Sequence, residues 1–227
     1  MMLAAMRAVA ENLLEAWTPA CERIEVAGSV RRRKADPHDL ELVAIPRLEV
    51  LTAKKDMFED TQVAMAESNL LDELLGEWKA GGRLRDRPDK NGRGAWGPKF
   101  KRALTADGVA VDIFSCGPGL GSQWGVIFAI RTGPADFSHA IVTSRLEGGF
   151  MPVGMQVKDG ALWINGDGGR ALIETPEEED FFEAINLPCW PPEERSLLRL
   201  AEWRSGGSVR GAGVSEQSAM RPTSGGR

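Results

Sequence analysis

Residues 38–46 read His-Asp-Leu-Glu-Leu-Val-Ala-Ile-Pro, and this stretch constrains the fold more than any other. Apolar side chains dominate it, which predicts a strand packed in the protein. Side chains alternate between the two faces of a strand, so Asp39 and Glu41 are predicted to lie on one face, opposite Leu40 and Leu42. Burying carboxylates without partners is costly. The stretch therefore predicts positive charge beside this face, unless the strand lies at a sheet edge and faces water.

A Gly-Ser turn and a basic run come just before this strand. Gly28 and Ser29 lead into three arginines and a lysine at positions 31–34, and a short helix is predicted over residues 30–34. A turn that opens a helix offers backbone N–H groups to phosphate oxygens, and guanidinium groups add charge-assisted hydrogen bonds. Alone, such a turn is usually only a turn, and a basic run is usually a solvated face. Their position before two acids favours a phosphate-binding site beside a metal site.

A third carboxylate, Asp112, lies in a second apolar stretch at residues 109–114. Alternation along that strand places it opposite Val111 and Ile113. Nucleotidyl transfer uses two divalent cations about 3.5–4 Å apart, and Mg²⁺ prefers oxygen ligands. The candidate catalytic residues and ligands of two Mg²⁺ ions, which Mn²⁺ can replace, are Asp39, Glu41 and Asp112.

Hydrophobic periodicity and turn signals predict helices and strands around these acids. A helix over residues 3–17 precedes the acidic strand, and a second helix over 61–79 follows it. The remaining predicted elements of the N-terminal half are a loop at 83–99, with room for short strands, and a hairpin of strands 100–105 and 109–114. The elements predicted after it are a helix from Pro134 to about residue 147, short strands within 151–173, a helix that starts at 175–178 and a last short helix at 197–203.

The length allows one large domain or two small ones, and the composition is ordinary for a soluble globular protein. The glycine-rich stretch at residues 117–121 is the predicted subdomain boundary. Three scattered cysteines show no metal-ligand spacing, which predicts reduced, buried thiols and fits a cytoplasmic protein. No apolar run is long enough to span a membrane. The net charge of −5 excludes a global basic field, so any nucleic-acid contact would use local patches and be weak and salt-sensitive.

A family resemblance follows from these motifs. The run Gly28-Ser29-x-Arg31-Arg32 with Asp39-x-Glu41 resembles the signature of nucleotidyltransferases with the DNA polymerase beta fold, and it is most similar to that of the family X DNA polymerases. The segment around Asp112 resembles the strand that bears their third catalytic aspartate. Thr132-Gly133 resembles their turn beside the sugar of the incoming nucleotide. Residues 175–195 resemble their C-terminal helix and proline-containing tail.

The resemblance implies an α+β fold. Residues 1–121 would form a polymerase-beta-like palm, a mixed sheet with flanking helices, and 122–204 a small α+β C-terminal subdomain that closes over the nucleotide and DNA. Residues 205–227, rich in Gly, Ser and Arg, are predicted to be a disordered tail. Besides the three acids as metal ligands, the resemblance implies five nucleotide-binding residues: Gly28, Ser29, Arg32, Thr132 and Gly133.

The expected activity is the addition of nucleotides from nucleoside triphosphates to a DNA primer 3′ end, as in gap-filling repair. So few residues precede Gly28 that the lyase domain of many family members is not expected. Three basic residues in the densest basic region are expected to contact DNA, although a solvated loop is an equal interpretation: Lys99, Lys101 and Arg102.

Several departures and alternatives remain open. Glu41 stands where the family usually has aspartate, and Ile130-Arg131 stand where many members carry aromatic residues, so the choice of sugar is not predicted. Transfer to another acceptor, such as RNA, a protein side chain or a small molecule, is the second hypothesis, and a non-catalytic nucleic-acid-binding module is the third. A monomer, with or without a protein partner, is expected in the cytoplasm, at the nucleoid or at a viral replication site, and not as a secreted protein.

Overall fold

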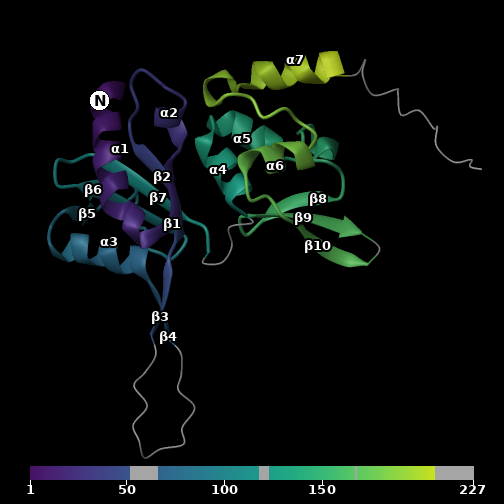
Figure 1. The fold of residues 1–227 in the computed structure, drawn as a ribbon. Helices are drawn as coiled ribbons and strands as arrows, with labels where there is room; N and C mark the ends of the chain where they lie inside the picture. The colour runs from purple at the N-terminus through teal and green to yellow at the C-terminus, as the bar shows by residue number, and fades with distance from the viewer. Residues whose placement is uncertain (52–65, 118–122, 167, 208–227) are drawn as a thin grey trace, which may run out of the picture.

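The computed structural model describes residues 1–51, 66–117, 123–166 and 168–207. Figure 1 shows two parts, an N-terminal part that contains a five-stranded sheet and a C-terminal part that contains a three-stranded sheet. Both parts contain helices as well as strands, which confirms the predicted α+β class with a mixed sheet and flanking helices. Within the described residues, no helix is long and apolar enough to cross a membrane.

The N-terminal part contains most of the predicted strands. Its elements are α1 (Leu3–Trp17), η1 (Thr18–Ala20), β1 (Cys21–Val26), α2 (Gly28–Arg31), β2 (Leu40–Pro46), β3 (Leu48–Leu51), β4 (Ala66–Asn69), α3 (Leu70–Ala80), β5 (Leu84–Asp86), β6 (Phe100–Thr105) and β7 (Ala110–Ser115). The sheet order is β1-β2-β7-β6-β5, and β2 is parallel to β7 while the other neighbours are antiparallel. The acidic strand is therefore a central strand, so the edge-strand interpretation of its two acids is wrong.

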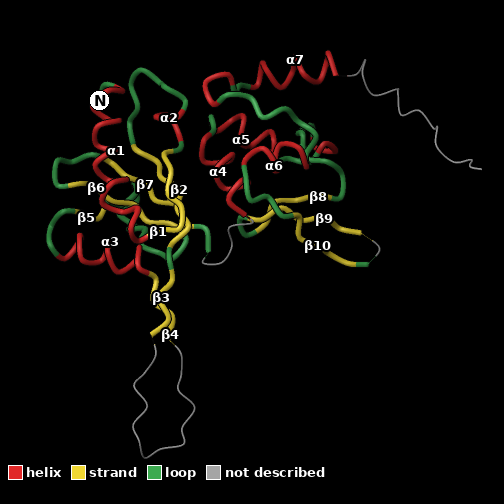
Figure 2. The backbone as a smooth tube through the Cα atoms, in the orientation of Figure 1, coloured by secondary structure: helices red, strands yellow, loops and turns green. Residues whose placement is uncertain are grey.

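The C-terminal part follows α4 (Trp124–Thr132). Its other elements are α5 (Ala135–Val142), η3 (Arg145–Glu147), β8 (Met155–Lys158), β9 (Ala161–Gly166), β10 (Gly169–Ile173), α6 (Glu178–Ala184), η4 (Pro192–Glu194) and α7 (Leu197–Gly207). The tube in Figure 2 shows β8, β9 and β10 as neighbouring strands, and they form an antiparallel sheet. Phe137, Phe181, Phe182 and Leu200 form the centre of this part's core.

The two faces of the five-stranded sheet have different partners. Leu40 and Leu42 of β2 belong to a core shared with α1 and α3, as do Val111 and Ile113 of β7. Val43 on the opposite face, together with Phe114 of β7, belongs to a second core shared with Trp124 and Phe128 of α4. The predicted alternation is confirmed for both strands. The face that carries Glu41 and Asp112 is consequently the face toward α4.

Two predicted helices have different bounds in the structure. Residues 61–65 of the helix predicted over 61–79 lie outside the described part. Within the described part the helix begins at Leu70, because residues 66–69 pair with β3 and Asn69 caps α3 by accepting a hydrogen bond from the Asp72 N–H at 3.0 Å. The helix predicted from Pro134 to about 147 begins after Pro134 and ends at Val142, because Thr143 takes an extended backbone conformation.

Three smaller predictions also need correction or lie outside the described residues. The short helix predicted over 30–34 is α2, which begins earlier, at Gly28. The predicted loop at 83–99 includes β5. Helix α7 extends to Gly207, so residues 205–207 of the predicted tail are helical, whereas residues 208–227 and most of the predicted boundary at 117–121 lie outside the part described.

Candidate active site

Three carboxylates gather where β2 and β7 run side by side. Glu41 of β2 is the direct register partner of Asp112 of β7. Asp39 immediately precedes β2, and one guanidinium connects it to Asp112: Arg87 Nη2 lies 3.7 Å from Asp39 Oδ2 and 2.8 Å from Asp112 Oδ1. We call Asp39, Glu41 and Asp112 the acidic cluster. The fold thus brings together the three acids that the sequence selected.

Guanidinium groups supply the positive charge that the acidic strand predicts. Besides Arg87, Arg102 Nε lies 3.4 Å from Asp112 Oδ1. Arg32 and Arg131 stabilise the ionised form of Glu41 through Coulomb attraction. The Arg131 side chain makes no hydrogen bond or ion pair with the described residues, and its guanidinium lies 3.9 Å from the ring centroid of Phe114.

Burial and neighbouring carboxylates oppose ionisation of Glu41 and Asp112. Burial, followed by the charges of Asp39 and Asp112, raises the pKa of Glu41 to about 7, although Arg32 and Arg131 oppose that rise. Burial also raises the pKa of Asp112, and Arg87 and Arg102 offset only part of the effect. A divalent cation between these groups would relieve the repulsion, because it attracts every carboxylate at once.

The donor set fits Mg²⁺, but the oxygens do not form a coordination shell in this arrangement. Three carboxylates are hard oxygen donors of the type that Mg²⁺ prefers. However, no group of three His, Cys, Asp or Glu residues in the described ranges is close enough to hold a metal ion. The side-chain contacts explain why, because Asp112 Oδ1 faces Arg87 and the Glu41 carboxylate is directed toward Gly28. Metal binding would require these carboxylates to turn toward one another.

Gly28 is packed tightly against Glu41. It opens α2 with a φ of +62°, and an ideal Cβ at this position would lie 1.8 Å from Glu41 Oε2. The backbone N–H of Ala27 also donates to the Glu41 carbonyl at 2.8 Å, which fixes the turn beside β2. A glycine is therefore required here for two reasons, the left-handed backbone conformation and the absence of a side chain.

A Gly28→Ala substitution is expected to destabilise the fold by roughly 2–4 kcal/mol, because it adds left-handed strain and a clash with Glu41. Chemical denaturation would measure the free energy of unfolding. Gly82→Ala is the matched control, since Gly82 has a φ of +75° but open space around its Cβ position. That control should cost only about 1 kcal/mol, and equal losses in the two variants would contradict the packing argument.

The basic run of α2 contacts the Thr132-Gly133 turn at the end of α4. Arg31 Nη1 donates to Thr132 Oγ1 at 2.6 Å, and Arg32 Nη1 donates to the Thr132 carbonyl. Gly133 has a φ of +71°, and a Cβ there would lie 2.8 Å from Arg32 Nη1. Predicted nucleotide-binding residues that are far apart in sequence are thus neighbours in the fold.

A cavity of about 410 Å³ lies beside this turn and the acidic cluster, and we call it the first cavity. It is lined by Arg32, Glu41, Ile130, Arg131, Gly133, Ala135, Ser138, His139 and Val142. The hydroxyl of Ser29, the residue after Gly28, is buried and has no hydrogen-bond partner among the described residues. A buried hydroxyl without a partner is costly, and an oxygen of a bound phosphate would satisfy it.

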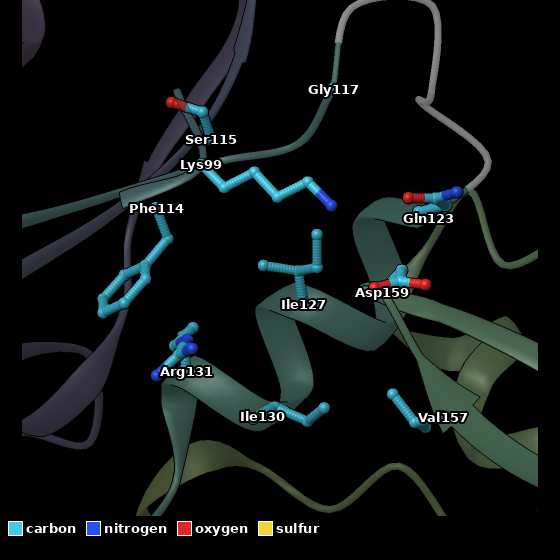
Figure 3. Close-up of a pocket in the computed structure, with 11 residues that line it drawn as sticks. Lys99, Phe114, Ser115, Gly117, Gln123, Ile127, Ile130, Arg131, Val157 and Asp159 are labelled. Carbon is cyan, nitrogen blue, oxygen red and sulfur yellow. The ribbon is translucent and has the colours of Figure 1, made fainter. Parts of the chain in front are cut away.

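A second cavity of about 370 Å³ lies on the other side of Arg131 and is drawn in Figure 3. Ile130 and Arg131 line both cavities. In Figure 3 the Lys99 side chain extends from the sheet across this cavity toward Gln123 of the C-terminal part. Ile127 of α4 lies next to it and forms an apolar wall of the cavity. The second cavity therefore combines an apolar wall with two cationic side chains.

The three predicted DNA-contacting residues have different environments. The Lys99 side chain is exposed and has no hydrogen-bond or ion-pair partner in the described ranges. Lys101 is 2% exposed, and its ammonium group donates to Asp72 Oδ1 at 2.5 Å and to the Gly97 carbonyl at 3.0 Å. Arg102 is paired with Asp112. In this arrangement the Lys101 ammonium group is buried and paired within the protein, so its contact with DNA stays a prediction that this arrangement does not favour.

An ion-pair network joins the two parts of the protein and was not predicted. Glu178 at the start of α6 is 4% exposed and accepts hydrogen bonds from Arg195 at 2.7 Å and from Arg31 at 2.9 Å and 2.7 Å. On the surface, Arg23 Nη1 donates to Glu177 at 2.9 Å. A helix start rich in acids was visible in the sequence, but nothing local indicated which arginines would reach it.

The Glu178 network predicts a stability that falls at low pH. Burial alone would raise the pKa of Glu178, but hydrogen bonds and charges of Arg195 and Arg31 lower the pKa below its ordinary value. A depressed pKa in the folded state stabilises the protein above the unfolded-state pKa, and this stabilisation is lost as pH falls through the folded-state pKa. Urea denaturation of wild type and Glu178→Gln across acidic pH should show the difference in unfolding free energy shrinking as pH falls. A difference independent of pH would contradict the assignment.

Two residues of the site received no predicted role from the sequence. Arg87 was one of many basic residues in a predicted loop, and no local pattern linked it to the acids. Arg131 was noted only as a departure from the family pattern.

Comparison of the chain with protein-family models gave no match, and comparison with curated proteins gave none either. The evidence on function is therefore the motif residues and their arrangement.

Proposed function

We propose that this chain is a Mg²⁺-dependent nucleotidyltransferase that adds nucleotides to a DNA primer 3′ end, as a small gap-filling polymerase similar to family X. The observation that supports this best is the first cavity. Glu41 of the acidic cluster, Arg32 of the basic run and Gly133 of the Thr-Gly turn all line it, although they are far apart in sequence. In this proposal the N-terminal part is a polymerase-beta-like palm, and the C-terminal part covers the nascent base pair.

Each group has a role that follows from its chemistry. Asp39, Glu41 and Asp112 would hold the two cations, which activate the attacking hydroxyl and neutralise the triphosphate. Arg32 would bind the triphosphate, because a guanidinium makes strong charge-assisted hydrogen bonds to phosphate. Ser29 would donate its unpartnered hydroxyl to a phosphate oxygen. Asp112 would help activate the primer 3′-hydroxyl. Phe114, which lies on the same face of β7 as Asp112, lines the second cavity.

Primer extension tests the proposal. The intact chain is incubated with a gapped DNA duplex, the four deoxynucleoside triphosphates and Mg²⁺ or Mn²⁺. Extension that requires the metal ion is expected, and extension should weaken at higher salt because DNA contacts are electrostatic. If folded protein extends no DNA primer with either metal, the polymerase proposal is wrong.

A second candidate is transfer of a nucleotide to another acceptor, such as RNA, a protein side chain or a small molecule. The specific observation in its favour is that two of the three predicted DNA contacts, Lys101 and Arg102, are engaged with acidic residues of the protein itself. The net charge of −5 agrees with a weak DNA surface. Labelled deoxynucleotides and ribonucleotides offered with DNA, RNA and protein acceptors would separate the two candidates.

A further inference from the structure

Arg87 connects the two aspartates of the acidic cluster. Its Nη2 lies 2.8 Å from Asp112 Oδ1 and 3.7 Å from Asp39 Oδ2, and the Arg87 side chain is 19% exposed. Glu41, the third member, has no such contact with Arg87. One guanidinium therefore occupies the space between two carboxylates that the proposed function assigns to a divalent cation.

The charges around the acidic cluster are already balanced by arginines. Arg87 and Arg102 contact Asp112 directly, and Arg32 and Arg131 act on Glu41 at longer range. Three carboxylates thus face four guanidinium groups. A divalent cation that enters this site is attracted by the carboxylates but repelled by the guanidinium groups, and at short range both effects are strong.

Of the two arginines that contact Asp112, Arg87 can move away more easily. Arg102 lies within β6 as the direct register partner of Asp112, so its position is set by the sheet. Arg87 follows the last residue of β5, a three-residue strand at the edge of the sheet, and precedes Pro88. Its backbone N–H makes only a long hydrogen bond, 3.5 Å, to the Arg102 carbonyl. Turning the Arg87 side chain away would leave the central strands intact.

We propose that Arg87 is a positioning residue that competes with the divalent cation for Asp39 and Asp112, and so sets the cation concentration at which the site fills. The proposal rests on the proposed function, because it takes the acidic cluster as the metal site. Cation binding requires Arg87 to release Asp112 Oδ1, with which it makes its shortest contact. Arg87 thereby acts through the two aspartates and not through contact with the substrate.

Direct metal binding tests this role without an activity measurement. Mn²⁺ is titrated into the full chain, and free Mn²⁺ is measured by electron paramagnetic resonance. Arg87→Ala is expected to bind Mn²⁺ roughly tenfold more tightly than wild type, because removing a competing cation favours the metal. Arg87→Lys, which keeps the charge but loses the planar fork, should fall in between. If Arg87 only stabilised the structure of the site, Arg87→Ala would bind Mn²⁺ more weakly than wild type, which is the opposite change.

Two further variants make the outcome decisive. Arg85→Ala is the matched control, since Arg85 lies in β5 two residues before Arg87, is exposed and has no contact with the acidic cluster in the part described. Its Mn²⁺ affinity should equal that of wild type. Folded Arg87→Ala with unchanged or weaker Mn²⁺ affinity would overturn the proposal. If Arg87→Ala does not fold, Arg87→Lys provides the test. A Mn²⁺ affinity of Arg87→Lys no higher than that of wild type would then overturn the proposal.

Asp112→Asn separates this proposal from the function on which it rests. Loss of Mn²⁺ binding in Asp112→Asn, together with no effect of Arg87→Ala, would reject the role of Arg87 and leave the metal site standing. Mn²⁺ binding by Asp112→Asn as tight as that of wild type would reject the metal site, and with it both proposals.

Discussion

Asp112→Asn is expected to lower nucleotide transfer by roughly 10³-fold or more, because the variant loses a charged metal ligand at the centre of the site. Asparagine has nearly the same shape and keeps an oxygen that can accept the hydrogen bond from Arg87. The fold should therefore persist, and circular dichroism with thermal melting would verify this. The rate of primer extension under saturating Mg²⁺ is the measurement.

Asp107→Asn is the matched control for this prediction. Asp107 lies in the exposed turn between β6 and β7, so the same chemical change is made in the same hairpin but away from the acidic cluster. Its rate should equal that of wild type. A folded Asp112→Asn variant that keeps a rate near that of wild type would show that Asp112 is not part of the reaction site.

Glu178→Ala is expected to lower the free energy of unfolding by roughly 3–5 kcal/mol, the usual cost of removing one partner from a buried ion pair. The variant would leave Arg195, whose side chain is 1% exposed, without its carboxylate. It would also remove the hydrogen bonds between Arg31 and Glu178. The contacts of the Arg31 side chain with the Thr132 hydroxyl and the Phe128 ring would remain. Urea denaturation monitored by tryptophan fluorescence would measure the loss.

Glu179→Ala is the control for the second prediction. Glu179 is the next residue in α6 and is exposed, so its removal should change the unfolding free energy by less than about 0.5 kcal/mol. Glu178→Gln keeps the volume and tests the charge alone. Equal stabilities of Glu178→Ala and Glu179→Ala would contradict the assignment of Glu178 as the buried link between the two parts.

The strand pattern was predictable because it depends on neighbours in sequence. A period of two fixes which side chains share a face, so Leu40 and Leu42 could be separated from Glu41 before the sheet was known. Helix starts and ends were less certain. The helix at Leu70 starts late because residues 66–69 pair with β3, and pairing with a distant strand has no local signal.

The sequence by itself determined the members of the acidic cluster, together with Arg32 and Gly133 beside the first cavity, because those motifs combine residue type with short spacing. Only the tertiary structure decided which basic side chains pair with which carboxylates. Lys101 and Arg102 are adjacent, yet one pairs with Asp72 of α3 and the other with Asp112, since successive residues of β6 face opposite sides of the sheet. Arg87 reaches the aspartates, and Arg31 reaches Glu178, only because the chain folds back on itself. Such long-range charge pairs have no sequence period, and that is why the fold alone revealed them.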